Sequence, residues 1–72
     1  MGGDERLEVY VLREVLHLHE ILIGSLQAGI RVIAGRFHDG KTTGLLAELT
    51  ADHEKDAFML RAMLWEVENR AA

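Results

Sequence analysis

The polar stretch His38-Asp39-Gly40-Lys41 divides the chain between two long apolar segments, residues 7–33 and 45–67. In both segments apolar side chains recur every three or four residues, which is the period of an α-helix. The two segments have similar lengths, and the break between them contains the turn residues Asp and Gly. The sequence therefore predicts an all-α fold, an antiparallel helical hairpin.

The flanking residues suggest where the predicted helices begin and end. Apolar periodicity and turn chemistry place the first helix at about 5–35, the turn at about 36–41 and the second helix at about 42–70. Thr42 or Thr43 is the expected N-cap of the second helix, because a hydroxyl can accept a hydrogen bond from a free amide there. The chain then forms a single helical-hairpin domain spanning residues 1–72.

Composition excludes several kinds of protein. The 72 residues include no cysteine, which rules out disulfides and thiolate metal sites, and no proline, so neither helix need be interrupted. The net charge is −4, from 8 basic and 12 acidic side chains, and this balance does not favour nucleic-acid binding. No uncharged apolar stretch is long enough for a membrane span, and the acidic first residues do not resemble a signal peptide. We expect a cytoplasmic protein.

The predicted inner face of each helix is wide. The first segment presents Leu12, Leu16, His19, Ile23, Leu26, Ile30 and Ile33. The second presents Leu45 or Leu46, then Leu49, His53, Ala57, Leu60, Leu64 and Val67. Val15, Leu18 and Leu22 widen the first face beyond what one partner helix covers, and a chain of this size forms only a marginal core by itself. We therefore expect self-association, with two hairpins forming a four-helix bundle.

A second row on the later helix carries Phe58 and the only tryptophan, Trp65, seven residues apart. That spacing returns both aromatic rings to one side of a helix, away from the inner face. Exposed aromatics so arranged indicate either a further contact surface or only the flank of the bundle.

Residues 35–42, Gly-Arg-Phe-His-Asp-Gly-Lys-Thr, match the phosphate-binding pattern G-x-x-x-x-G-K-[ST]. That loop binds phosphate when it follows a buried strand of a parallel sheet and precedes a helix. Residues 30–33 could form one such strand, but the helical period of apolar residues continues through them. The alternatives are a phosphate or nucleotide site and a turn whose Gly and Thr serve its conformation.

Three side chains on or beside the inner faces are candidate metal ligands: His19, His53 and Asp56. Imidazole nitrogens and a carboxylate suit iron, zinc or manganese. The alternative is a core histidine without metal, with His19 or His53 paired to Asp56 or Glu20. His17 is not expected to share a metal with His19, since residues two apart point to different sides of a helix.

The run Thr-Gly-Leu-Leu-Ala-Glu-Leu-Thr-Ala-Asp-His-Glu-Lys-Asp-Ala-Phe-Met-Leu-Arg-Ala-Met-Leu at 43–64 resembles the last helix of the Dps proteins, ferritin-like proteins that protect DNA during starvation. Leu12-Arg13-Glu14, His19-Glu20 and the Ser-Leu-Gln-Ala run at 25–28 are similar to the helix before it. The resemblance spans about residues 7–66. Phe58 stands where the family usually has Trp.

The resemblance implies half of a ferritin-like bundle, assembly into hollow oligomers and a parent role in iron storage under stress. Iron is the metal it suggests. In that family the ferroxidase ligands come from the first two helices of the bundle, whereas this chain resembles the last two, so no family ligand is carried over to a residue here. The first hypothesis is thus a Dps-like hairpin without its own ferroxidase site, for which we expect no enzymatic activity of this chain alone. A metal-binding bundle and a phosphate site at 35–42 are the alternatives.

Overall fold

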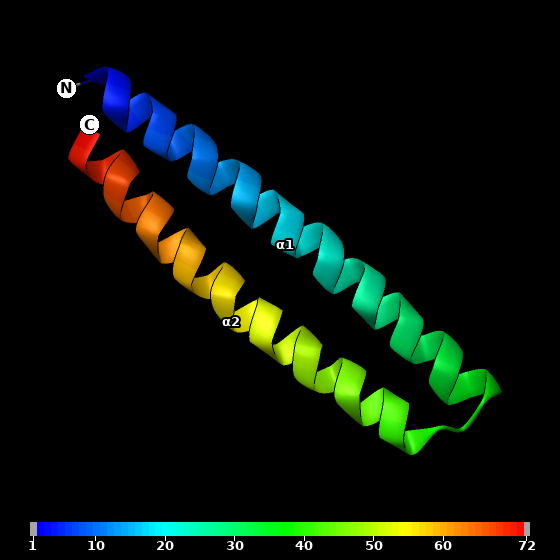
Figure 1. Cartoon of the computed structure of the whole chain (residues 1–72). Helices are drawn as coiled ribbons and strands as arrows, with labels where there is room; N and C mark the ends of the chain where they lie inside the picture. The colour runs from blue at the N-terminus through cyan, green and yellow to red at the C-terminus, as the bar shows by residue number, and fades with distance from the viewer. Residues whose placement is uncertain (1, 72) are drawn as a thin grey trace.

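The computed structural model describes the backbone of residues 2–71 and the side chains of residues 5–70. Two helices, α1 (Gly2–Arg36) and α2 (Gly40–Ala71), run antiparallel, so that the two termini lie at the same end (Figure 1). The described residues contain no strand, which confirms the predicted all-α hairpin. Both helices extend beyond the bounds expected from the sequence, and the connection is only residues 37–39.

The connection ends α1 and begins α2 through specific backbone groups. The amides of Phe37 and His38 both donate to the carbonyl of Ile33, at 2.9 and 3.2 Å, and His38 has a positive φ of 50°. A residue in this left-handed conformation reverses the chain after a helix. His38 therefore fills a place that glycine usually takes.

Asp39 is the N-cap of α2, so the prediction of Thr42 or Thr43 was wrong. The backbone amide and the hydroxyl of Thr42 donate to the Asp39 carboxylate at 3.1 and 2.7 Å, and the Thr43 hydroxyl donates to the Asp39 carbonyl at 2.8 Å. These bonds from Thr42, the hydroxyl first, hold the pKa of Asp39 below its ordinary value. A carboxylate accepts from a free helical amide more strongly than a hydroxyl does, and it also interacts favourably with the helix dipole.

The helices meet along a seam in which intervals of three and four residues alternate. This seven-residue repeat is typical of coiled-coil packing. The seam positions of α1, which are buried or half-buried, are Val9, Leu12, Leu16, His19, Ile23, Leu26, Ile30 and Ile33. Those of α2 are Thr43, Leu46, Thr50, His53, Ala57, Leu60, Leu64 and Val67.

The inner face predicted for α1 is therefore confirmed, while that of α2 needs a correction at its start. Leu46 lies in the seam and Leu45 does not, and Thr50 takes the place predicted for Leu49. Thr50 is buried in the seam. Its hydroxyl tolerates this burial because it donates a hydrogen bond to the Leu46 carbonyl at 2.7 Å. A Leu at 49 looks apolar enough for the seam, but the regular repeat places it one position to the side.

The hairpin forms very little core. Within the described part of the chain, the buried apolar side chains are Leu12, Ala57 and Val67. The molecule measures 53 × 14 × 13 Å, and its radius of gyration is 16.2 Å, whereas a compact chain of this length has about 11 Å. Each helix thus covers one narrow side of the other and leaves its remaining surface exposed.

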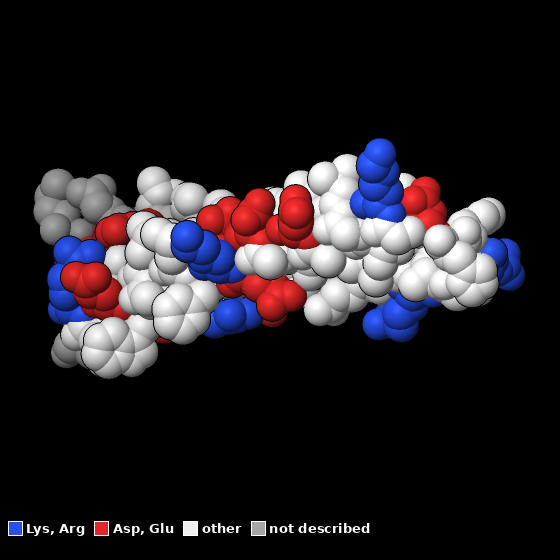
Figure 2. Space-filling model, turned by 90° about the horizontal axis from the view of Figure 1, so that it is seen from below, with Lys and Arg blue, Asp and Glu red and all other residues white. Residues whose placement is uncertain are grey.

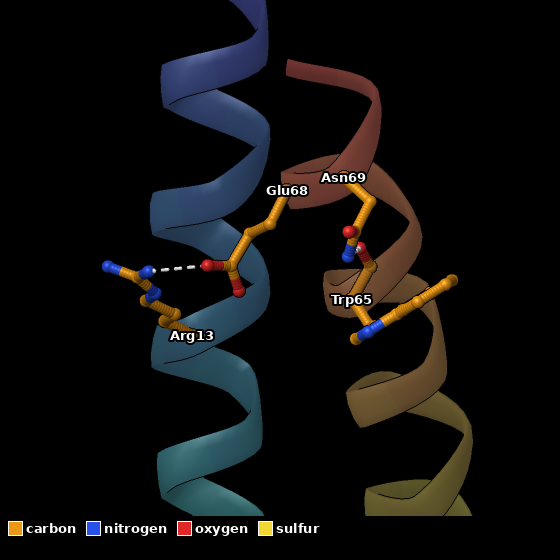
Figure 3. Close-up of polar contacts among 4 residues, drawn as sticks. All are labelled: Arg13, Trp65, Glu68 and Asn69. Atoms are coloured by element: carbon orange, nitrogen blue, oxygen red, sulfur yellow. Dashed lines mark hydrogen bonds and ion pairs between the residues drawn. The ribbon is translucent and has the colours of Figure 1, made fainter. Parts of the chain in front are cut away.

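Among the residues whose side chains are described, two ion pairs join the helices near the termini. The Arg13 guanidinium lies 3.0 Å from the Glu68 carboxylate, as Figure 3 shows, and Arg70 lies 3.8 Å from Glu8. All four side chains are largely exposed, so each pair contributes about 0–1 kcal/mol. Neither helix, over residues 2–71, has an apolar stretch long enough to cross a membrane.

Candidate functional site

The structure brings His19 and His53 together in the middle of the seam. Their Nδ1 atoms are 3.0 Å apart, and their rings are tilted by 47° with centroids 5.1 Å apart. Both side chains are half-buried. A hydrogen bond between two Nδ1 atoms requires one imidazole to donate and the other to accept. The prediction that a core histidine would pair with Asp56 or Glu20 was therefore wrong, because the two histidines are hydrogen-bonded to each other.

Asp56 completes a group of three potential metal ligands. One donor atom from each of His19, His53 and Asp56 lies within 4.8 Å of the others, and no second such group occurs among the described residues. Asp56 is exposed and lies at the edge of a shallow groove. The groove is lined by Val15, His19, Asp56, Met59, Leu60 and Met63. The three residues that the sequence singled out as ligands are thus neighbours in the fold.

The stretch at residues 35–42, which matches the phosphate pattern, does not have the strand–loop–helix geometry of a phosphate-binding loop. The residues that would have to form its strand, 30–33, lie within α1. The amide of Thr42, at the start of α2, donates to the Asp39 carboxylate, which also places a negative charge where a phosphate would bind. The geometry favours the conformational interpretation of this stretch.

A largely apolar surface runs along one side of the seam, interrupted on α2 by Asp52 and Asp56. Its members, which we call the flanking apolar face, are Val11, Val15, Leu18, Leu22 and Val32 of α1 with Leu45, Leu49, Met59 and Met63 of α2, all exposed. On each helix these residues follow the same seven-residue repeat as the seam, displaced by one position. The groove that contains Val15, Met59 and Met63 shows that the two helices contribute to one surface. Side chains of this kind are usually covered in a stable fold.

The opposite side of the seam is mixed in character. Phe58 and Trp65 are exposed there, and the groove beside Phe58 is lined by Glu20, Glu54 and Arg61 as well as apolar atoms. Figure 3 shows the Trp65 side chain pointing away from α1. The aromatic row predicted from the sequence therefore exists on its own side of α2. It is interrupted by charges of both signs, whereas the flanking apolar face is interrupted by the acidic Asp52 and Asp56.

The view in Figure 2, taken from another side, shows charged side chains separated by wide uncharged areas. Apolar side chains outside the flanking apolar face, among them Leu7, Ile21 and Phe58, are also exposed. Sequence reasoning found Val15, Leu18 and Leu22 but missed the contribution of Met59 and Met63. The signal was present in the spacing of the α2 residues, since Leu45 and Met59, like Leu49 and Met63, are separated by two seven-residue repeats.

Fold and site together define a class: an antiparallel two-helix coiled coil with a polar layer of two histidines and an exposed apolar side. No protein-family model, curated protein or solved structure matches the chain. The resemblance to the Dps family therefore stays a prediction from the residues that carry it.

Proposed function

We propose that this chain is a self-association module in which two hairpins pack through their flanking apolar faces to form a four-helix bundle. The observation that carries the proposal is that face itself, an aliphatic surface contributed by both helices and extending along much of their length. Two such faces packed against each other would adopt the shallow crossing of four-helix bundles.

The solvent-exposed area of the single hairpin supports a second copy of the chain as the partner that covers the flanking apolar face. The hairpin exposes 5484 Å², whereas a folded monomer of 8.1 kDa exposes roughly 4,500 Å². The excess is about 1,000 Å², close to the roughly 800 Å² that each partner buries in a standard protein interface. A symmetric dimer therefore removes about the area by which this chain exceeds a compact protein.

The composition of the face also suits contact with its own copy. A twofold interface places one surface against itself, so it must be complementary to itself. Val, Leu and Met side chains meet this condition, because dispersion and the hydrophobic effect attract two identical apolar surfaces to each other. A face rich in one charge would instead repel its copy. The acidic groups on the α2 side, Asp52 and Asp56, are the exception.

The iron-storage role implied by the Dps resemblance stays a separate prediction. A dimer of hairpins would have the four-helix architecture of the ferritin-like proteins, which is the element of that prediction that the proposal shares. The proposal does not require iron oxidation, and no residue of this chain is assigned to it.

Light scattering coupled to size-exclusion chromatography tests the proposal on the full chain. With metal chelated, the expected mass at micromolar concentration is about twice 8.1 kDa, falling toward 8.1 kDa on dilution. A folded species that keeps the single-chain mass up to high micromolar concentration would refute self-association, and it would leave another protein as the occupant of the face.

A further inference from the structure

We propose that His19, His53 and Asp56 form a binding site for a divalent first-row transition metal ion such as Zn²⁺. The donor atoms of all three lie within 4.8 Å of one another, and they come from both helices. Two imidazoles and one carboxylate form a ligand set found in zinc sites that leave a position open.

The distance between the histidines fits such an ion. Zinc–nitrogen bonds of about 2.0–2.1 Å in tetrahedral geometry place two nitrogens about 3.3 Å apart. The Nδ1 atoms of His19 and His53 are 3.0 Å apart. An increase of a few tenths of an ångström in this distance is enough to admit the ion. Asp56 is exposed, and its side chain is free to rotate toward the pair.

The placement of the histidines is a second reason. Seam positions of α1 are otherwise aliphatic from Val9 to Ile33, and in α2 the layers around His53 hold Thr50 and Ala57. Apolar packing in the seam is therefore poorest where His19 and His53 meet, a place where leucine side chains would pack better. Departures from good packing that coincide in space are typical of functional sites.

Access to the site is also present. The groove beside His19 and Asp56 opens to solvent between Val15, Met59 and Met63. An ion held there by three protein ligands keeps a further coordination position for water or for a group brought by another molecule. Because every ligand belongs to one chain, the hairpin binds the ion without a second copy.

Zinc titration of the full chain, followed by calorimetry and by thermal unfolding, tests the site. We expect saturation at one ion per hairpin. At a free zinc concentration 100-fold above the dissociation constant, we expect a rise in melting temperature of about 10–20 °C that EDTA reverses. Absence of saturable zinc binding in the titration refutes the proposal.

Leucine substitutions separate ligation from folding. His19→Leu and His53→Leu place an aliphatic side chain at a seam position, so both variants are expected to fold at least as well as the native chain, and each is expected to lose at least about 100-fold in zinc affinity. Retention of native affinity in both variants overturns the assignment. Asp56→Asn keeps the shape of the side chain and is expected to weaken binding about 10-fold or more, and unchanged affinity in this variant refutes the three-ligand site.

His17→Leu is the matched control, since His17 is exposed and two residues from His19. It is expected to bind zinc like the native chain, and a loss equal to that of His19→Leu would show that surface imidazoles account for the binding. Repeating the titration on Leu45→Glu, a variant of the flanking apolar face away from the ligands, shows whether zinc binds when self-association is weakened. The zinc titrations and the measurements of molecular mass therefore distinguish a failure of the metal-site proposal from a failure of the dimer proposal.

Discussion

Replacement of Leu18 with glutamate is the most direct perturbation of the proposed dimer. Leu18 is 63% exposed in the hairpin and lies within the flanking apolar face, beside Val15 and Leu22. Because the side chain contributes little to the single hairpin, we expect Leu18→Glu to change its stability by no more than about 0.5 kcal/mol. In the dimer the same side chain would be covered, so the loss would appear in association.

The magnitude follows from the area that association removes from water. Complete burial of a leucine is worth about 1.5–3 kcal/mol, and with 63% of Leu18 still exposed, roughly 1–2 kcal/mol of this remains to be gained in each copy. A symmetric dimer counts the residue twice, which gives about 2–4 kcal/mol, or a dissociation constant roughly 30-fold to 1,000-fold higher. The desolvation of two glutamates adds to this loss.

Sedimentation equilibrium over a range of concentrations measures the dissociation constant, and circular dichroism verifies that the helices remain. Leu7→Glu is the matched control, because Leu7 is also 63% exposed but lies on the outer side of α1. We expect Leu7→Glu to associate like the native chain. Equal effects of the two substitutions, or none from Leu18→Glu, would show that the flanking apolar face is not the interface.

Three further predictions concern the hairpin itself. His38→Gly should stabilise it by about 0.5–1 kcal/mol in urea unfolding, because glycine adopts the positive φ of 50° without steric cost; an unchanged midpoint would contradict this. Gly24→Ala should stabilise it by about 0.5–1 kcal/mol in the same assay, since an added Cβ meets no atom within 4 Å, and destabilisation would reveal a close contact at this position. Bonds from Thr42 lower the pKa of Asp39, so its contribution is complete above the ordinary aspartate pKa and is lost as the pH falls through the lowered value of the folded state. The melting temperature of the native chain should therefore fall more than that of Asp39→Asn across this acidic range, and parallel pH profiles would argue against the cap.

The pattern of apolar residues was sufficient to predict the hairpin, because a long uninterrupted helical period and one turn leave few alternatives. The choice of seam residues in α2 was harder. Leu45 and Leu46 are adjacent and equally apolar, and Thr50 is a polar residue in a buried position. Its burial depends on the bond to the Leu46 carbonyl, which spacing alone does not reveal.

The candidate site was predictable in its members but not in its bonding. His19 and His53 were placed on inner faces by their spacing, and an antiparallel hairpin brings the middles of its helices together. The length of the connection decides which residues of α1 lie opposite which residues of α2. That length depends on Asp39 as the N-cap of α2. From the sequence, Thr42 or Thr43 is the expected cap and Asp39 is only a turn residue, and a difference of a few residues there decides which side chain faces His19.

The two proposals meet at Asp56. Its carboxylate belongs to the ligand group with the histidines and also lines the groove of the flanking apolar face. Covering a free carboxylate with a second hairpin costs free energy, because the charge loses water without gaining a partner. A divalent cation bound beside it supplies that partner. Metal binding and self-association are then thermodynamically linked: an ion that makes it easier to cover Asp56 must bind more tightly to the dimer than to the single hairpin, by the same factor by which it strengthens the dimer.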